Sequence, residues 1–101
     1  VLTPAAPDSI KAMIARGDAM QPTISDGDLI WVDVSIKTPT SDGLYLFALK
    51  GEVFVKRLRL DNFNHSAAII SDNPLYPPIG ISKPDKLSTL GKVISVTKIY
   101  R

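Results

Sequence analysis

Hydrophobic and polar residues alternate through the stretch from Leu29 to Ile36. The residues of one parity are branched and apolar: Ile30, Val32, Val34 and Ile36. Asp33 and Ser35 occupy the other parity. Because side chains on a strand point alternately to its two faces, this pattern is typical of a strand that is buried on one face. The stretch is therefore predicted to be a half-buried strand.

Other apolar stretches, each bounded by turn residues, predict further strands. They cover residues 10–16, 44–49, 52–60, 66–71 and 87–100. The second and third of these flank Lys50-Gly51 and are expected to form a hairpin. The closing stretch is expected to bend at Gly91 and to present Val93–Tyr100 as an exposed sheet edge.

The connections between these strands are rich in turn residues. Residues 37–43 carry Pro39 and Asp42-Gly43, and residues 61–64 form the next turn. Residues 72–84 contain four of the eight prolines, and irregular or edge structure is expected there because proline lacks the amide that a central strand needs. No stretch has the pattern of a helix-turn-helix. The chain is predicted to be mostly β, a small, twisted and partly closed sheet.

Composition narrows the possible functions. The 101 residues suffice for one domain, with residues 1–9 expected as an extended arm and residues 10–101 as the domain itself. The formal charge of +2 is small, so neither nucleic acid nor a membrane surface is required as a direct partner. With no cysteine and one histidine, a metal site is not expected, nor is any cofactor. Apolar runs are far shorter than a membrane span and no signal peptide is visible, so a cytoplasmic protein is expected.

The segment from Ala15 to Asp28 is predicted to be a constrained loop between two strands. Gly17 permits backbone conformations that a side chain would obstruct. Pro22 fixes its own φ and pushes the preceding residue toward an extended conformation. Asp26-Gly27-Asp28 is a turn signal, and the two carboxylates are expected to cap and form turns rather than to bind a metal. The small residue Ala19 is expected at the tip of the loop.

Lys56 is the residue most suggestive of chemistry. Strand alternation places it on the same face as Phe54 and Leu58. Among apolar neighbours an amine loses hydration, which lowers its pKa, and a neutral amine near pH 7 can act as a general base. The alternative is a lysine at a strand margin that reaches into solvent. Arg57 and Arg59 lie on the opposite face, where a solvated or dimer-edge role is expected.

Several motifs together resemble a known family. The run Gly17-Asp18-Ala19-Met20-Gln21-Pro22-Thr23-Ile24, followed by Asp26-Gly27-Asp28, is similar to the Gly-Asp-Ser-Met-x-Pro-Thr-Ile…Gly-Asp box of LexA-like self-cleaving repressors, the peptidase S24 family. Val55-Lys56-Arg57-Leu58 resembles the strand that carries the catalytic lysine of that family. Asn73-Pro74-Leu75-Tyr76-Pro77-Pro78-Ile79 resembles its Asn-Pro-x-Tyr-x-Pro element, and Gly91-Lys92-Val93-Ile94 its closing strand. The matches occur in the family's order over residues 10–99, which implies the β fold shared by LexA and signal peptidase.

The resemblance assigns roles to individual residues. Ala19 occupies the position of the nucleophilic serine, and Lys56 that of the general base. The backbone amides of Asp18 and Ala19 are the implied oxyanion donors. Gly17, Met20 and Pro22 are implied to form the loop and substrate pocket. Without a hydroxyl at position 19 the covalent step cannot occur, so this chain is expected to be inactive as a peptidase.

Two explanations of Ala19 remain open. A serine replaced on purpose would trap an uncleaved state, whereas a natural repressor that does not cleave itself would have no need of the hydroxyl. An unpaired buried Lys56 has little reason to persist once catalysis is lost. That argument favours the replaced serine.

The implied function is the C-terminal domain of a LexA-like or phage-type transcriptional repressor. Such a domain forms homodimers, and its self-cleavage is induced by the RecA–single-stranded DNA filament during the SOS response to DNA damage. Operator DNA would be bound by an N-terminal domain preceding Val1, and the scissile bond would also lie upstream of Val1. The alternatives are a non-cleaving dimerisation module controlled by an antirepressor and a UmuD-like accessory protein. No membrane partner is expected.

Overall fold

The computed structural model describes residues 7–49, 51–81 and 88–100. Residues 1–6 of the expected N-terminal arm lie outside that range, and Pro7–Ser9 form a short 3₁₀ turn, η1. The described residues form seven strands: β1 (Ile10–Ile14), β2 (Leu29–Asp33), β3 (Gly43–Leu49), β4 (Glu52–Asp61), β5 (Ser66–Ile70), β6 (Ile79–Ile81) and β7 (Ser88–Thr97).

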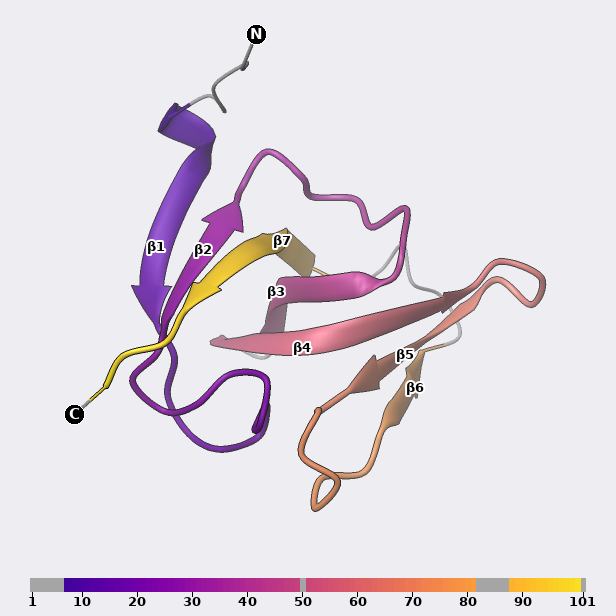
Figure 1. Cartoon of the computed structure of the whole chain (residues 1–101). Coiled ribbons are helices and arrows are strands. Elements are labelled where there is room, and N and C mark those ends of the chain that lie inside the picture. The colour runs from indigo at the N-terminus through magenta and orange to yellow at the C-terminus, as the bar shows by residue number, and fades with distance from the viewer. Residues whose placement is uncertain (1–6, 50, 82–87, 101) are drawn as a thin grey trace, which may run out of the picture.

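The strands form one antiparallel sheet in the order β1-β2-β7-β3-β4-β5-β6. It is strongly twisted, so that β1 and β2 run at a steep angle to β3 and β4 (Figure 1). The two edge strands, β1 and β6, do not pair with each other, and the sheet remains open. The prediction of a mostly β domain is confirmed. No helix among the described residues is long and apolar enough to cross a bilayer.

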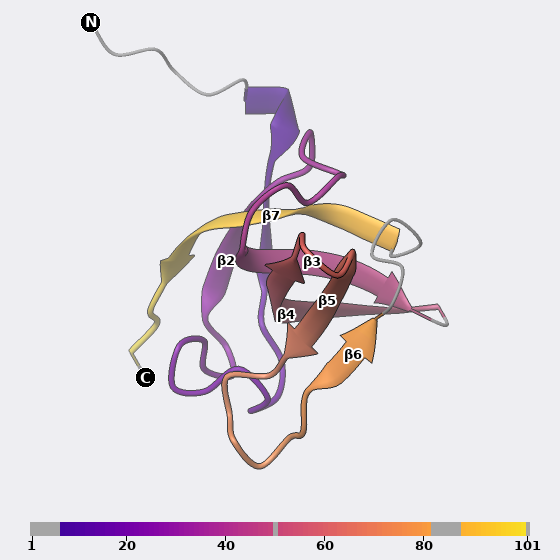
Figure 2. The same ribbon diagram turned by 90° about the vertical axis from the view of Figure 1, so that its right-hand side faces the viewer.

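Strand β7 joins the two parts of the sheet by changing partners along its length. Residues 88–92 pair with β3, whereas residues 92–97 pair with β2. Leu46 pairs with Gly91 and Phe47 with Thr89, so Leu90 is an extra residue that bulges beside Gly91, and such bulges bend a strand. The bend predicted at Gly91 is confirmed, and Figure 2 shows β7 curving over the sheet. The expectation that Val93–Tyr100 is a sheet edge is wrong, because β7 lies inside the strand order and its last strand residue is Thr97.

The buried hydrophobic side chains form two clusters, and β3 contributes to both. One combines the loop after β1 with β2, β3 and β7, and consists of Met20, Ile24, Ile30, Val32, Leu46 and Val93. The other belongs to β3, β4 and β5, and consists of Tyr45, Phe47, Leu58, Ala67 and Ile69. Because Met20 and Ile24 belong to the first cluster, burial of apolar surface fixes the loop against the sheet.

The strand predictions hold with shifted ends. The hairpin of β3 and β4 is confirmed, and β6 is an edge strand inside the proline-rich stretch, as expected. Strand β2 ends at Asp33 rather than Ile36, because the carboxylate of Asp33 accepts hydrogen bonds from the amide and the hydroxyl of Ser35 and so forms a turn. Strand β1 likewise ends at Ile14. Residues 82–87, which include the predicted start of the closing strand, lie outside the described residues.

We expect Gly91→Ala to destabilise the fold, because a Cβ there would lie 2.6 Å from Cγ1 of Val32 and 2.8 Å from the carbonyl oxygen of Asp33. Overpacking of this kind costs about 2 kcal/mol of the free energy of unfolding. Gly80→Ala is the matched control, since a Cβ at Gly80 meets no atom within 4 Å. Urea unfolding of both variants measures the difference. Equal stability of the two variants would contradict this description of the bend.

Candidate functional site

A cleft of about 300 Å³ opens beside the loop between β1 and β2. One wall is the end of β1 with the residues that follow it, 13–17, and the opposite wall is residues 53–56 of β4. Strand β5 pairs with β4 only from Arg57 onward, so residues 53–56 have no strand partner on that side in the described structure. Ile24, Ile30 and Leu46 belong to the apolar part of the lining. Ala19 and Lys56 both line this cleft, so the structure brings the two sequence-predicted residues into one site.

The loop is held in shape by its own turn residues. The amide of Gly17 donates to Oδ1 of Asp26 (2.7 Å), and the amide of Gly27 donates to the carbonyl of Ala15 (2.8 Å). Gly17 and Gly27 have φ values of 87° and 90°, which a residue with a side chain rarely adopts. The turn-forming role predicted for Asp26 is therefore confirmed, and the described residues contain no group of three or more side chains suited to a metal ion.

Asp28 anchors the far end of the loop. Its carboxylate is almost fully buried, accepts the amide of Ser25 at 2.8 Å and pairs with the ammonium of Lys98 at 2.7 Å. Lys98 also donates to the carbonyl of Thr23 (2.7 Å). The hydrogen bond from Lys98 and the one from the Ser25 amide hold the pKa of Asp28 below its ordinary value. This ion pair ties the chain after β7 to the loop and to β2.

Lys56 lies in the cleft wall with its side chain half-buried. Its amine donates to Oγ of Ser71 at 2.8 Å and lies 6.0 Å and 5.8 Å from the ring centroids of Phe54 and Tyr76. Burial among these groups lowers the pKa of Lys56 from its ordinary value. The shift has the direction that a general base requires, since it enlarges the neutral fraction of the amine.

The partner of Lys56 corrects one sequence argument. Lys56 was expected to be an unpaired amine, and its persistence beside Ala19 then favoured a replaced serine. Because Ser71 accepts a hydrogen bond from it, Lys56 has a structural reason to persist in either case. The persistence of Lys56 therefore no longer discriminates between the two origins of Ala19.

A second segment, residues 71–76 after β5, clamps the loop. The amide of Asn73 donates to the carbonyl of Ala19, and its side-chain Nδ2 donates to the carbonyl of Asp18, each at 3.0 Å. The hydroxyl of Tyr76 donates to Oδ1 of Asp18 at 2.6 Å, and this bond raises the pKa of Tyr76. Figures 1 and 2 show the two loops side by side at one end of the molecule. Sequence reasoning gave Asn73 and Tyr76 no role, although both stand in the Asn-Pro-x-Tyr element.

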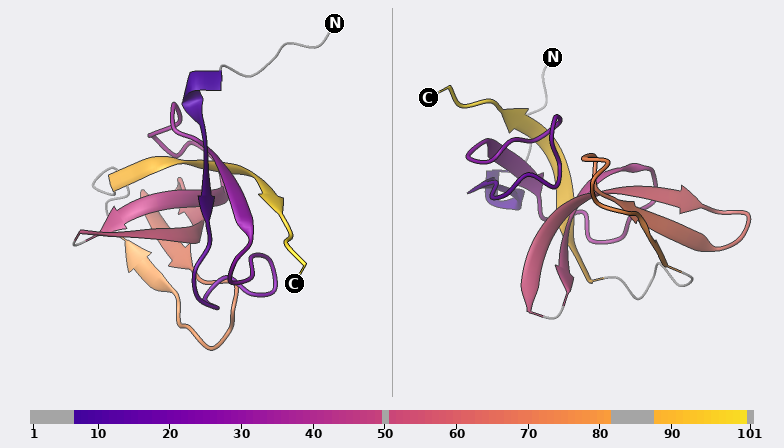
Figure 3. Two further views of the ribbon diagram at one scale, coloured as in Figure 1. Left: turned by 90° about the vertical axis from the view of Figure 1, so that its left-hand side faces the viewer. Right: turned by 90° about the horizontal axis from the view of Figure 1, so that it is seen from below.

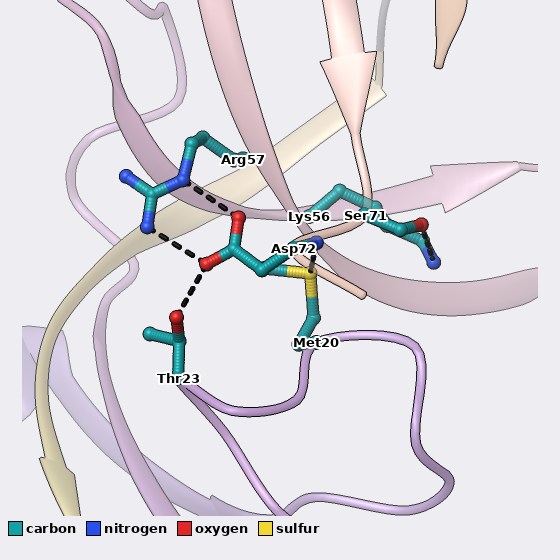
Figure 4. Close-up of polar contacts among 6 residues, drawn as sticks. All are labelled: Met20, Thr23, Lys56, Arg57, Ser71 and Asp72. Atoms are coloured by element: carbon teal, nitrogen blue, oxygen red, sulfur yellow. Dashed lines mark hydrogen bonds and ion pairs between the residues drawn. The ribbon is translucent and has the colours of Figure 1, made fainter. Parts of the chain in front are cut away.

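Arg57 also belongs to this clamp, which corrects the expectation of a solvated or dimer-edge residue. Its Nε and Nη2 each lie 2.8 Å from a carboxylate oxygen of Asp72, and Asp72 also accepts a hydrogen bond from the hydroxyl of Thr23 in the loop. The amide of Asp72 contacts Sδ of Met20 at 3.4 Å. In Figure 4, Arg57 and Lys56 extend to opposite sides of the strand, as alternation predicts. Arg59 is exposed, as expected.

The remaining predicted site residues are divided between the cleft and its surroundings. Gly17 and Met20 line the cleft, whereas Pro22 is exposed on the same loop and does not belong to that lining. The amides of Asp18 and Ala19 donate to no other described residue. Free amides are what an oxyanion hole requires, and their assignment as oxyanion donors stays a prediction.

Comparison with known proteins identifies the family of the chain and two similar proteins. The model of the Peptidase S24-like family matches residues 2–94. The chain is 39% identical over 89 residues to the 26 kDa repressor protein of Escherichia phage HK022, covering 86% of this chain and 37% of that protein. It is 34% identical over 92 residues to an uncharacterized HTH-type transcriptional regulator of Haemophilus influenzae (strain ATCC 51907 / DSM 11121 / KW20 / Rd), covering 88% of this chain and 38% of that protein. The chain thus spans less than two-fifths of the length of either relative.

We expect Asp72→Asn to lower the free energy of unfolding at neutral pH by about 1 kcal/mol. The effect is smaller than for a fully buried ion pair, because the Arg57 side chain is 39% exposed and solvent screens the pairing. Arg57 and the Thr23 hydroxyl hold the pKa of Asp72 below its ordinary 3.8. A carboxylate with a lowered folded-state pKa stabilises the fold above the unfolded-state pKa, and that stabilisation is lost as the pH falls through the folded-state value.

The difference between parent and Asp72→Asn should therefore shrink below pH 4 and vanish once Asp72 is protonated in the folded protein. Chemical unfolding from pH 7 to pH 2 measures it. A difference that stayed constant down to pH 2 would mean that the carboxylate charge of Asp72 contributes nothing.

Proposed function

The chain belongs to the peptidase S24-like family, and from that premise we propose that it is the regulatory, C-terminal domain of a phage-type transcriptional repressor. The proposed domain forms homodimers and retains the site of a Ser-Lys autopeptidase that lacks its nucleophile. The two similar proteins are a phage repressor and an HTH-type regulator, which supports a role in transcription. The remainder of such a protein would bind operator DNA in the cytoplasm, and dimerisation of this domain would let it grip a two-fold operator.

The observation that carries the proposal is the cleft shared by Ala19 and Lys56. In a chain with serine at position 19, the neutral amine of Lys56 would take the hydroxyl proton while the oxygen attacks a peptide carbonyl carbon. The peptide C–N bond would then break, the amine leaving group would receive the proton, and water would hydrolyse the resulting ester. Free amides at positions 18 and 19 would stabilise the oxyanion. Ala19 offers no oxygen for the first step, so in this proposal the chain forms dimers but does not cleave its own linker.

Ala19 itself supports a second candidate, a naturally non-cleaving dimerisation module. Because Ser71 gives Lys56 a structural partner, the lysine could remain in a repressor that never cleaves itself. Such a repressor would be released by an antirepressor protein, whereas a self-cleaving parent would respond to a RecA–single-stranded DNA filament. A UmuD-like accessory protein is the third possibility. The residue encoded at position 19 in the natural gene separates the first two candidates.

We expect Ala19→Ser, made in a longer chain that includes the residues preceding Val1, to restore cleavage of the upstream linker. Because the base is the neutral amine, the rate should rise with pH through the lowered pKa of Lys56 and then level off. A gel time course from neutral to alkaline pH, with and without activated RecA filament, measures the rate.

Lys56→Met in the Ala19→Ser background is the control, since methionine keeps most of the volume of lysine and removes the amine. This variant should lower the cleavage rate at least about 100-fold, which is the typical effect of losing a general base. If the serine-bearing chain stays intact at high pH while its fold is preserved, the peptidase proposal fails. The domain would then be a dimerisation module.

We also expect the domain to self-associate at tens of micromolar. Among the described residues, the edge strands β1 and β6 each pair with one neighbouring strand, and Ile94 in β7 and Ile99 after it are about half exposed. Sedimentation velocity should show a dimer or a larger species. A clean monomer at that concentration would count against a dimerisation role.

A further inference from the structure

Three consecutive residues after β5 reach three different parts of the candidate site. Oγ of Ser71 accepts the hydrogen bond of Lys56 at 2.8 Å. Asp72 binds Arg57 through both carboxylate oxygens and also contacts the loop at Thr23 and Met20. Asn73 donates to the carbonyls of Asp18 and Ala19. Figure 4 shows Asp72 between Arg57 and the loop residues Thr23 and Met20, and Ser71 in contact with Lys56 on the other side of the strand.

Sheet register explains why Ser71 meets Lys56. Strands β4 and β5 are antiparallel, and their pairing begins at Arg57 with Ile70. Ser71, the next residue, follows the last pair and so stands across from Lys56. Directly opposed residues of an antiparallel pair project from the same face and are in contact distance. The serine hydroxyl therefore meets the amine where β5 leaves the sheet and the cleft begins.

Asn73 fixes the other side of the site. The residue is 9% exposed, and its four polar groups are all used. Nδ2 and the backbone amide bind the loop, Oδ1 accepts the amide of Leu75, and the carbonyl accepts the amide of Tyr76. The two loop carbonyls that it binds belong to the two successive peptide groups that flank Cα of Ala19. Fixing two successive peptide groups fixes the direction of Cβ at position 19, because the backbone has only two soft dihedrals per residue.

We propose that Ser71-Asp72-Asn73 is the positioning element of this site, with Ser71 orienting the amine of Lys56 and Asn73 orienting position 19. The inference rests on the proposed function, and it names residues that the peptidase comparison does not assign. Position 19 lies in a loop and Lys56 on β4, and both are hydrogen-bonded to this segment within three residues of chain. A shift of about 1 Å between nucleophile and base costs on the order of 100-fold in rate. One short segment that is hydrogen-bonded to both therefore keeps them aligned.

The first test uses the chain as it stands and follows the Nζ resonance of Lys56 by NMR as pH is raised. The ammonium donates to Ser71, and a hydrogen bond to the charged form favours that form. Ser71→Ala should therefore move the Lys56 midpoint down by at least about half a pH unit. Ser71→Thr, which keeps the hydroxyl, should restore the parent midpoint. Tyr76, whose ring centroid lies 5.8 Å from the amine, and Arg16, which lines the same cleft, are unchanged in both variants.

The second test uses the longer Ala19→Ser chain. Ser71→Ala should shift the pH at which the cleavage rate levels off by the same amount as the NMR midpoint, and Ser71→Thr should reverse that shift. Asn73→Ala should slow cleavage at least about tenfold at every pH, because position 19 is no longer oriented. Asn64→Ala is the matched control: Asn64 also uses its Nδ2, in a bond to Asp61, but it lies in the exposed turn after β4. It should leave the rate unchanged.

These results separate positioning from simple support of the fold. A role in stability alone would lower the melting temperature of Ser71→Ala without moving the Lys56 midpoint, and that result would overturn the proposal for Ser71. Cleavage by Asn73→Ala at the parent rate, with the fold intact, would overturn it for Asn73. If Ala19→Ser does not cleave at all, the peptidase proposal fails, whereas the Lys56 midpoint in the present chain still decides whether Ser71 orients the amine.

Discussion

The structure of the site depends on the hydrogen bonds that Asn73 donates to the carbonyls of Asp18 and Ala19. Without them the backbone at residues 18 and 19 would be fixed mainly through side chains: Met20 and Ile24 in the hydrophobic cluster, Asp18 bound by Tyr76, and Thr23 bound to Asp72. Apolar burial is non-directional, so it can hold a loop against a sheet without fixing where one backbone atom points. The two bonds supply that direction. They also join segments more than 50 residues apart in sequence, which makes the site a property of the complete fold.

The sheet provides the framework on which this contact is possible. Strand β7 pairs with β3 along one half and with β2 along the other, so the sheet turns where Gly91 lies against Val32. Figure 3 shows the result from the side and from below: the loop after β1 lies beside the connection between β5 and β6. The cleft lies beside the part of β4 that has no partner in β5 in the described structure. Ala19 and Lys56 both line this cleft, so the loop after β1 and this part of β4 face one space.

Sequence patterns predicted most of the sheet and part of the site. Period-two alternation identified β2 and placed Lys56 and Arg57 on opposite faces, because alternation is a local property of a strand. It did not identify Ser71 as the partner of Lys56 or Asp72 as the partner of Arg57. Those contacts depend on the register of β4 against β5, which no local pattern specifies. The end of β2 at Asp33 also escaped prediction, since the side-chain turn with Ser35 competes with a strand pattern that continues to Ile36.

Under the proposed function, the cleft shared by Ala19 and Lys56 is a peptidase site that lacks the hydroxyl oxygen of its nucleophile. Lys56 has a lowered pKa, the amides at positions 18 and 19 are free within the described structure, and Ala19 has a methyl group where a serine would carry a hydroxyl. The most direct measurement is mass spectrometry of Ala19→Ser after treatment with a fluorophosphonate, which reacts preferentially with an activated serine hydroxyl and needs no linker substrate. The account predicts a single phosphonyl adduct at position 19 that disappears when Lys56→Met is added. A folded Ala19→Ser protein that stays unmodified at alkaline pH would contradict it.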